Sequence, residues 1–142
     1  MQYENETRVF FTSKSENERF ARLFVTGFLT PLDPTVSEIT EIKTAVSEAV
    51  TNAIIHGYEE KRGSIELFCA YVKNKVYIEI ADKGSGIENI ALAREPLYTS
   101  KPEMERSGMG FTIMETFMDH IHIQSEEGNG TRIFMEKTLT KE

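Results

Sequence analysis

The stretch from Ser37 to His56 is the feature that most limits the folds open to this chain. Its apolar residues recur at spacings of three and four, which is the period of an amphipathic α-helix. They are Ile39, Ile42, Ala45, Val46, Ala49, Val50, Ala53 and Ile54. An apolar face this wide must be covered by a second layer of structure. We expect Gly57 to cap the C-terminus of this helix.

The remaining segments predict paired strands with helices between the pairs. Alternating apolar residues predict strands, and apolar residues at helical spacing predict two more helices. The expected strands are 9–13, 64–72, 75–81, 120–124 and 131–136, and the expected helices are 16–29 and 108–118. The inward side chains of the two central strands are expected to be Ile65, Leu67, Val76, Ile78 and Ile80. Ser15 and Glu18 have the spacing of a capping box at the start of the first helix.

This pattern predicts the α+β class, with one domain over residues 1–142. We expect a two-layer sandwich in which helices cover one face of a mixed sheet. A chain of 142 residues can bury a core of its own without disulfides, and Cys69 is its single cysteine.

Charge and composition narrow the classes of function. The net charge is −7, which disfavours direct nucleic-acid binding because that function needs a basic surface. No apolar run approaches the roughly 20 residues of a membrane span, and the polar first residues are unlike a secretory signal. We therefore expect a cytoplasmic protein without membrane contact.

Two polar residues interrupt the long helix near its buried face. Glu48 and Asn52 are four residues apart, so they share one side of the helix. They can be ordinary solvated groups at a helix edge. In the functional interpretation, the Asn52 carbonyl binds Mg²⁺, an ion that prefers oxygen ligands, and Glu48 deprotonates or orients a nucleophile.

Two glycine-rich segments flank a long loop. Asp82, Gly84 and Gly86 directly follow a strand, where a carboxylate can accept a hydrogen bond from a ligand amine and glycines allow close backbone approach. Gly108 and Gly110 open a helix, whose first N–H groups can bind an anion. Each segment alone also fits an ordinary turn or hinge.

Basic residues precede the second glycine segment. Lys101 and Arg106 lie in the loop and can neutralise a γ-phosphate, although most such side chains are simply solvated. Gly130-Thr131 then leads into the last strand. The ordered set of motifs is far less probable by chance than any one of its members.

This ordered set resembles the GHKL superfamily of ATPases and kinases. The resemblance implies the Bergerat sandwich fold and a site for ATP or ADP with Mg²⁺. It implies that Asp82 binds the adenine amino group, that Asn52 holds the metal, and that Glu48 is the general base. The implied nucleotide contacts also include Gly84, Gly86, Thr99, Lys101, Ser107, Gly108, Met109, Gly110 and Thr131.

Across nearly the whole chain, the sequence is similar to the anti-sigma-F family of spore-forming bacteria. The segments 47–58 and 105–115 carry most of this similarity. The family implies a homodimeric protein-serine kinase that phosphorylates a STAS-type anti-anti-sigma factor and also binds and inhibits a sporulation sigma factor. By the same resemblance, Arg22 and Glu18 lie on the partner-binding helix, and Arg106 reaches the γ-phosphate.

Other functions remain open on the residues alone. A binding module that is gated by nucleotide, without phosphoryl transfer, would need the same motifs. The catalytic domain of a histidine kinase is disfavoured, because no helical hairpin with a phosphoacceptor histidine precedes the motifs. A stress-response anti-sigma kinase is disfavoured by the segment 105–115 and by the Ser-Glu-Asn-Glu sequence at 15–18.

Overall fold

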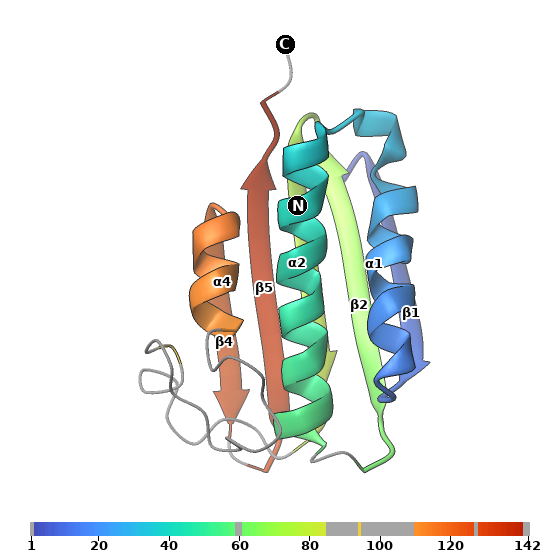
Figure 1. The fold of residues 1–142 in the computed structure, drawn as a ribbon, viewed down its shortest axis with the longest axis vertical. Helices are drawn as coiled ribbons and strands as arrows, with labels where there is room; N and C mark the ends of the chain where they lie inside the picture. Colours follow the sequence, from blue (N-terminus) through green and yellow to red (C-terminus); the bar gives the residue numbers. More distant parts are fainter. Residues whose placement is uncertain (1, 59–60, 85–93, 95–109, 127, 141–142) are drawn as a thin grey trace.

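The computed structural model describes residues 2–58, 61–84, 94, 110–126 and 128–140, and these form two layers (Figure 1). Among the described residues, three helices lie side by side on one face of a five-stranded sheet, with α2 between α1 and α4. The helices are α1 (Glu16–Phe28), α2 (Val36–Asn52) and α4 (Gly110–Phe117). Short 3₁₀ and π turns, η1 (Thr30–Leu32) and η2 (Ala53–Gly57), flank α2. The expected α+β sandwich is thus confirmed.

The sheet has the strand order β1-β2-β3-β5-β4. Its strands are β1 (Asn5–Thr12), β2 (Ser64–Val72), β3 (Lys75–Asp82), β4 (His120–Glu126) and β5 (Gly130–Thr138). Every described pairing is antiparallel, so the expectation of a mixed sheet was wrong. The physical reason is the place of β5. It inserts between β3 and β4, which run in the same direction but never become neighbours.

The core lies between the helices and the inner face of the sheet. The five side chains predicted to point inward from β2 and β3 are each at most 2% exposed, which confirms that prediction. From the helix layer, Ile42, Ala45, Val46, Ala49 and Val50 are fully buried against them. Within the described part of the chain, no helix is long and apolar enough to cross a membrane.

Helix α2 begins with a capping box that was not predicted from the sequence. The Thr35 side chain accepts a hydrogen bond from the Glu38 N–H (3.1 Å), and the Glu38 carboxylate accepts one from the Thr35 N–H (2.9 Å). The box predicted at Ser15 is absent, because Ser15 has helical backbone angles and its side chain makes no capping bond. A residue in helical conformation cannot aim its side chain at the N–H groups of the first turn.

Helix α2 also ends differently from the prediction. Its last turn widens into η2, in which the Tyr58 N–H donates to the Ala53 carbonyl (3.0 Å). Gly57 does not adopt the left-handed conformation of a C-terminal cap, so that prediction was wrong. A side chain at Gly57 would instead collide with the carboxylate of Asp82.

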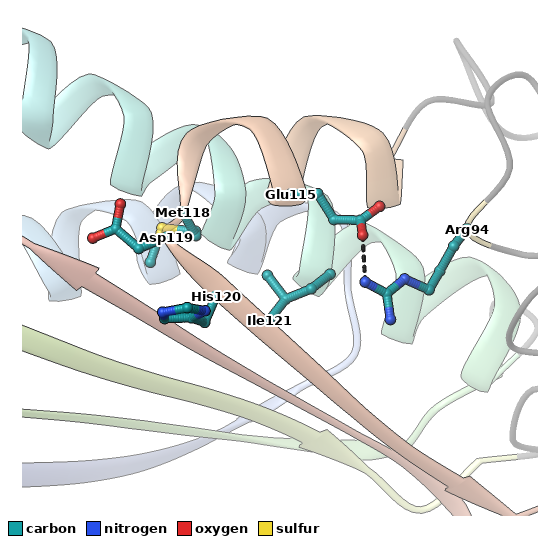
Figure 2. Close-up of a pocket in the computed structure, with 6 residues that line it drawn as sticks. All are labelled: Arg94, Glu115, Met118, Asp119, His120 and Ile121. Atoms are coloured by element: carbon teal, nitrogen blue, oxygen red, sulfur yellow. Dashed lines mark hydrogen bonds and ion pairs between the residues drawn. The ribbon is translucent and has the colours of Figure 1, made fainter.

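Helix α4 turns back into β4 through Met118 and Asp119. A pocket at this junction is lined by Arg94, Glu115, Met118, Asp119, His120 and Ile121, and Arg94 forms an ion pair with Glu115 within it (Figure 2). None of these six residues belongs to the predicted nucleotide site. The pocket is therefore a separate feature of the α4–β4 corner.

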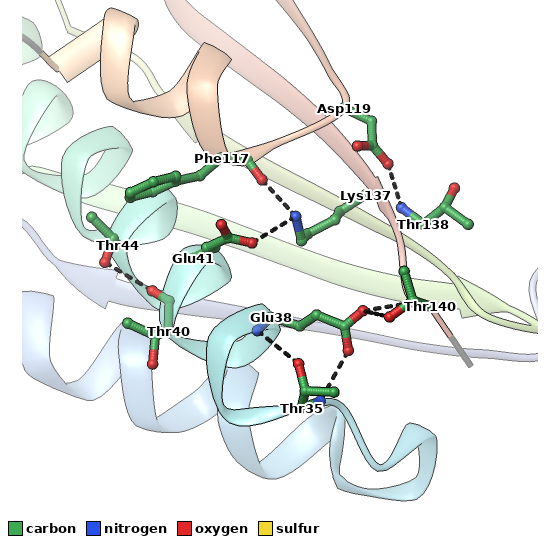
Figure 3. A network of polar contacts seen from close by, with 10 residues as sticks. All are labelled: Thr35, Glu38, Thr40, Glu41, Thr44, Phe117, Asp119, Lys137, Thr138 and Thr140. Carbon is green, nitrogen blue, oxygen red and sulfur yellow. Dashed lines mark hydrogen bonds and ion pairs between the residues drawn. The ribbon is translucent and has the colours of Figure 1, made fainter. Parts of the chain in front are cut away.

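Polar contacts fasten the end of β5 to the helix layer (Figure 3). The Lys137 ammonium donates to the Phe117 carbonyl (2.7 Å) and pairs with Glu41 (3.1 Å). The N–H and hydroxyl of Thr140 both donate to the Glu38 carboxylate, at 2.6 and 2.9 Å. The backbone bond from Thr140 is the main reason that the pKa of Glu38 falls to about 2.

Candidate nucleotide-binding site

Asp82 is the last residue of β3 and is 7% exposed. It stands opposite Thr131, near the start of β5. Burial raises the pKa of its carboxyl group, while hydrogen bonds from the backbone N–H groups of Gly84 (2.8 Å) and Thr131 oppose the rise. A carboxylate has about four acceptor positions, so these two bonds leave capacity for a further N–H donor.

Three glycines form a close-fitting cradle around Asp82. A Cβ atom on Gly57 would lie 2.7 Å from the Asp82 carboxylate, and one on Gly84 would lie 1.9 Å from the Gly57 carbonyl oxygen. A Cβ on Gly130 would lie 2.2 Å from the Asp82 carbonyl oxygen, and its φ of +90° also favours glycine. The cradle therefore admits no side chain at any of the three positions.

Thr131 completes this part of the site from β5. It is 3% exposed, and its hydroxyl lies 2.8 Å from that of Ser125 on β4. The Ser125 hydroxyl also donates to the Gly130 carbonyl (3.2 Å). The structure thus brings together three parts of the predicted set where β3 ends and β5 begins. They are Asp82, Gly84 and Gly130-Thr131.

Tyr58 lies at this candidate site and was not predicted from the sequence to belong to it. Its hydroxyl accepts a hydrogen bond from the Lys83 N–H (2.8 Å) and donates one to the Ser64 carbonyl (2.6 Å). Lys83 directly follows Asp82, so the tyrosine holds the turn that carries the carboxylate. Its place directly after the long helix and Gly57 was the one available signal.

Glu48 and Asn52 lie one turn apart on the last part of α2, and both are half-buried. The η2 turn that follows Asn52 contacts β3 and β5, and its Gly57 touches the Asp82 carboxylate. The carboxylate and the amide therefore stand on the helix that ends at the cradle. Their oxygen atoms suit Mg²⁺, which needs few protein ligands when phosphates and water complete its shell.

The N-terminus of helix α4 points toward the same end of strands β3 and β5. Its C-terminal residue Phe117 bonds Lys137 near the far end of β5, so Gly110 begins the helix at the Thr131 end. That placement agrees with an anion site at the helix start. Seven predicted site residues lie outside the described part of the chain. They are Gly86, Thr99, Lys101, Arg106, Ser107, Gly108 and Met109.

The predicted partner-binding residues occupy α1, on the other side of α2 from α4. Arg22 and Glu18 form an ion pair one helical turn apart, with 3.1 Å between Nε and Oε1. Phe20 and Leu23 on the same helix are 41% and 64% exposed. This helix therefore presents charged and apolar groups together, separately from the Asp82 cradle.

Known proteins that are similar to this chain agree with the predicted family and with the observed fold. The family model described as histidine kinase-like ATPase domain matches residues 11–137. An anti-sigma F factor of Clostridium kluyveri (strain ATCC 8527) is 55% identical over 96% of both chains, and one of Clostridium acetobutylicum (strain ATCC 824) is 58% identical over 94% of both. A crystal structure of the RsbU and RsbW domains of Rv1364c from Mycobacterium tuberculosis superposes with a TM-score of 0.67 at 21% identity. The superposition covers 95% of this chain and 32% of the longer mycobacterial chain, and it supports the fold.

Proposed function

Because the chain belongs to the anti-sigma F factor family and carries a histidine kinase-like ATPase domain, we propose that it is an ATP-dependent protein-serine kinase that also inhibits a sporulation sigma factor. Its kinase substrate in this proposal is a serine of a STAS-type anti-anti-sigma factor. The observation that carries the proposal is the buried Asp82 carboxylate in its glycine cradle.

The cradle suits the adenine base of ATP. The three glycines let the neighbouring backbone pack directly against Asp82 and so fix its carboxylate. The 6-amino group of the base offers an N–H donor to the remaining acceptor positions of that carboxylate. A hydrogen bond to a carboxylate in this buried place is stronger and more selective than one in water. Asp82 thus accounts for the choice of base in the proposal.

Glu48 and Asn52 carry the transfer step in the proposal. The serine hydroxyl of the partner attacks the γ-phosphorus, its proton passes to the Glu48 carboxylate, and ADP leaves. Asn52 would hold Mg²⁺, which neutralises phosphate charge when it is bound. Lys101 and Arg106 are proposed to face the γ-phosphate, and the other predicted glycine-segment residues to line the phosphates.

Helix α1 is proposed to bind the protein partners. Arg22 and Glu18 place one positive and one negative group on its surface, and the exposed Leu23 adds apolar contact area. Protein interfaces commonly combine charged and apolar groups in this way. A homodimer through residues 9–28 is also proposed, because Phe10 in this segment is 63% exposed. Sedimentation at micromolar concentration tests the dimer, and a monomer there would contradict it.

A transfer assay with Glu48→Gln tests the kinase proposal. The purified protein is incubated with γ-labelled ATP, Mg²⁺ and a STAS-domain partner, and phosphoserine is measured on the partner. We expect the wild type to label the partner and the variant to lose at least about a hundredfold in rate, in line with loss of a general base. ATP affinity should be unchanged, because Glu48 is not proposed to touch the base.

Glu79→Gln is the matched control for this experiment. Glu79 pairs with Arg132 at 2.8 Å, and it lies between the inward-facing Ile78 and Ile80 on the outer face of the sheet. It should retain full transfer. Full activity of Glu48→Gln would refute the base assignment, and tight ATP-dependent partner binding without labelling by the wild type would favour a nucleotide-gated binding module instead.

A further inference from the structure

Tyr58 joins three backbone segments at the edge of the candidate site. Its hydroxyl accepts from the Lys83 N–H (2.8 Å), beside Asp82, and donates to the Ser64 carbonyl (2.6 Å), at the start of β2. Its own backbone ends the π-helical turn that follows α2. One hydroxyl therefore ties the Asp82 turn both to the sheet and to the end of the helix that carries Asn52.

The ring of Tyr58 is fixed in place from beneath. A Cβ on Gly63 would lie 2.4 Å from the ring, so the ring rests on the glycine backbone. Ser13, which is 6% exposed, holds this backbone by accepting from the Gly63 N–H (2.8 Å) and donating to the Lys61 carbonyl (3.0 Å). The Gly63 carbonyl also accepts from the Ser13 N–H (2.9 Å). The hydroxyl thus stands on a support that permits little displacement.

The residue next to Tyr58 touches the carboxylate itself. Gly57 packs against the Asp82 side chain, and its carbonyl oxygen fills the space where a side chain of Gly84 would be. Asp82 is therefore held from the helix side by Gly57 and from the turn side through Tyr58 and Lys83. The wide η2 turn places both contacts in consecutive residues, and such π turns are frequent at functional sites.

We propose that Tyr58 is a positioning residue for base recognition, whose hydroxyl sets the Asp82 carboxylate to accept from the 6-amino group of adenine. This inference rests on the proposed function. If the Tyr58 hydroxyl is removed, the Lys83 N–H and the Ser64 carbonyl each lose a partner, and the turn relaxes away from its set position. The affinity that is lost is that of the hydrogen bond between Asp82 and the amino group, and the contacts to the ribose and phosphates are unchanged.

Nucleotide selectivity of Tyr58→Phe tests the inference. Affinity is measured by calorimetry for ATP and for purine riboside triphosphate, which lacks the 6-amino group. We expect the variant to bind ATP about tenfold more weakly, the effect of one good hydrogen bond, and to bind the second nucleotide as the wild type does. A merely structural role would weaken both nucleotides alike and leave their ratio unchanged, which would overturn the inference.

Tyr71→Phe is the matched control. The Tyr71 hydroxyl accepts a hydrogen bond from Asn5 (3.2 Å), far along β2 from Ser64, so its removal should leave both affinities unchanged. Ser13→Ala is a second variant in case Tyr58→Phe does not fold. It removes the hydroxyl that bonds Gly63 and Lys61 under the Tyr58 ring. It should reduce the preference for ATP over purine riboside triphosphate, by a smaller factor than Tyr58→Phe does. An unchanged preference in Ser13→Ala would then overturn the inference.

The wild type and Asp82→Asn separate this inference from the proposed function. If the wild type fails to prefer ATP, or if Asp82→Asn keeps that preference, base recognition by Asp82 itself is wrong. If both behave as proposed while Tyr58→Phe keeps the full preference, the positioning role alone is wrong.

Discussion

In the proposed function, Asp82 trades stability for binding. Because burial raises the pKa of its carboxyl group, the charged form is disfavoured in the folded protein relative to the unfolded chain. Its stabilising contribution is therefore complete only below the unfolded pKa and is lost as the pH rises through the folded pKa. At neutral pH the buried charge is a cost that the folded protein carries.

The variant Asp82→Asn should lose ATP affinity at least about tenfold. Its free energy of unfolding at about pH 7 should change by less than about 1 kcal/mol, because removal of the buried charge offsets the weakened hydrogen bonds. The asparagine oxygen can still accept from the Gly84 N–H. Denaturant unfolding at about pH 7 and just below the ordinary carboxyl pKa of 3.8 measures the effect. The wild type should gain stability relative to the variant as the pH falls, and a relative loss would contradict the pKa direction.

The residues of this site were partly readable from the sequence. Asp82 and Gly84 were predicted because a carboxylate and glycines directly after a strand are visible in the order of residues, whereas Thr131 was predicted only through the resemblance to the GHKL superfamily. Gly57 was predicted as a helix cap and Tyr58 was not predicted as a site residue. Their roles come from contacts with residues about 25 positions later, which local patterns do not encode.

At the scale of elements, the start of α2 depends on its capping box. Thr35→Ala removes the side-chain acceptor of the Glu38 N–H and should lower the free energy of unfolding by about 1 kcal/mol. Ser15→Ala, at the corresponding place before α1, should change it far less because Ser15 makes no capping bond. Thermal and denaturant unfolding of both variants test this, and equal losses would contradict the assignment of the caps.

The two candidate boxes also show what local patterns leave undecided. Both Ser15-Glu18 and Thr35-Glu38 have the required spacing, and only the second forms. Thr35 has an extended backbone, whereas Ser15 is already helical. Strands β2 and β3 were predicted almost to the residue, because alternation and the turn at Lys73-Asn74 are purely local signals.

For the whole molecule, the contact between Glu38 and Thr140 links the start of α2 to the chain beyond β5 (Figure 3). The pKa of Glu38 falls from the ordinary 4.5 to about 2, mainly through the backbone bond from Thr140. A lowered folded pKa means that this stabilisation is present above the unfolded pKa and is lost as the pH falls through about 2. The wild type should therefore be more stable than Glu38→Gln at neutral pH.

Acid unfolding followed by circular dichroism tests this link. The stability difference between the wild type and Glu38→Gln should shrink between about pH 4.5 and about pH 2. Glu126→Gln, on β4, has no such contact with Thr140 and serves as the control for general acid effects. A difference that stays constant across this range would contradict the link.

The place of β5 in the sheet has a consequence for synthesis on the ribosome. A nascent chain emerges from its N-terminus, so β3 and β4 are exposed before the strand that must lie between them is available. The cradle around Asp82 takes its last wall, Gly130 and Thr131, from that same late strand. A chain that ends before β5 therefore lacks part of the candidate nucleotide site. In the proposed function, ATP binding by Asp82 would therefore have to wait until translation has passed β5.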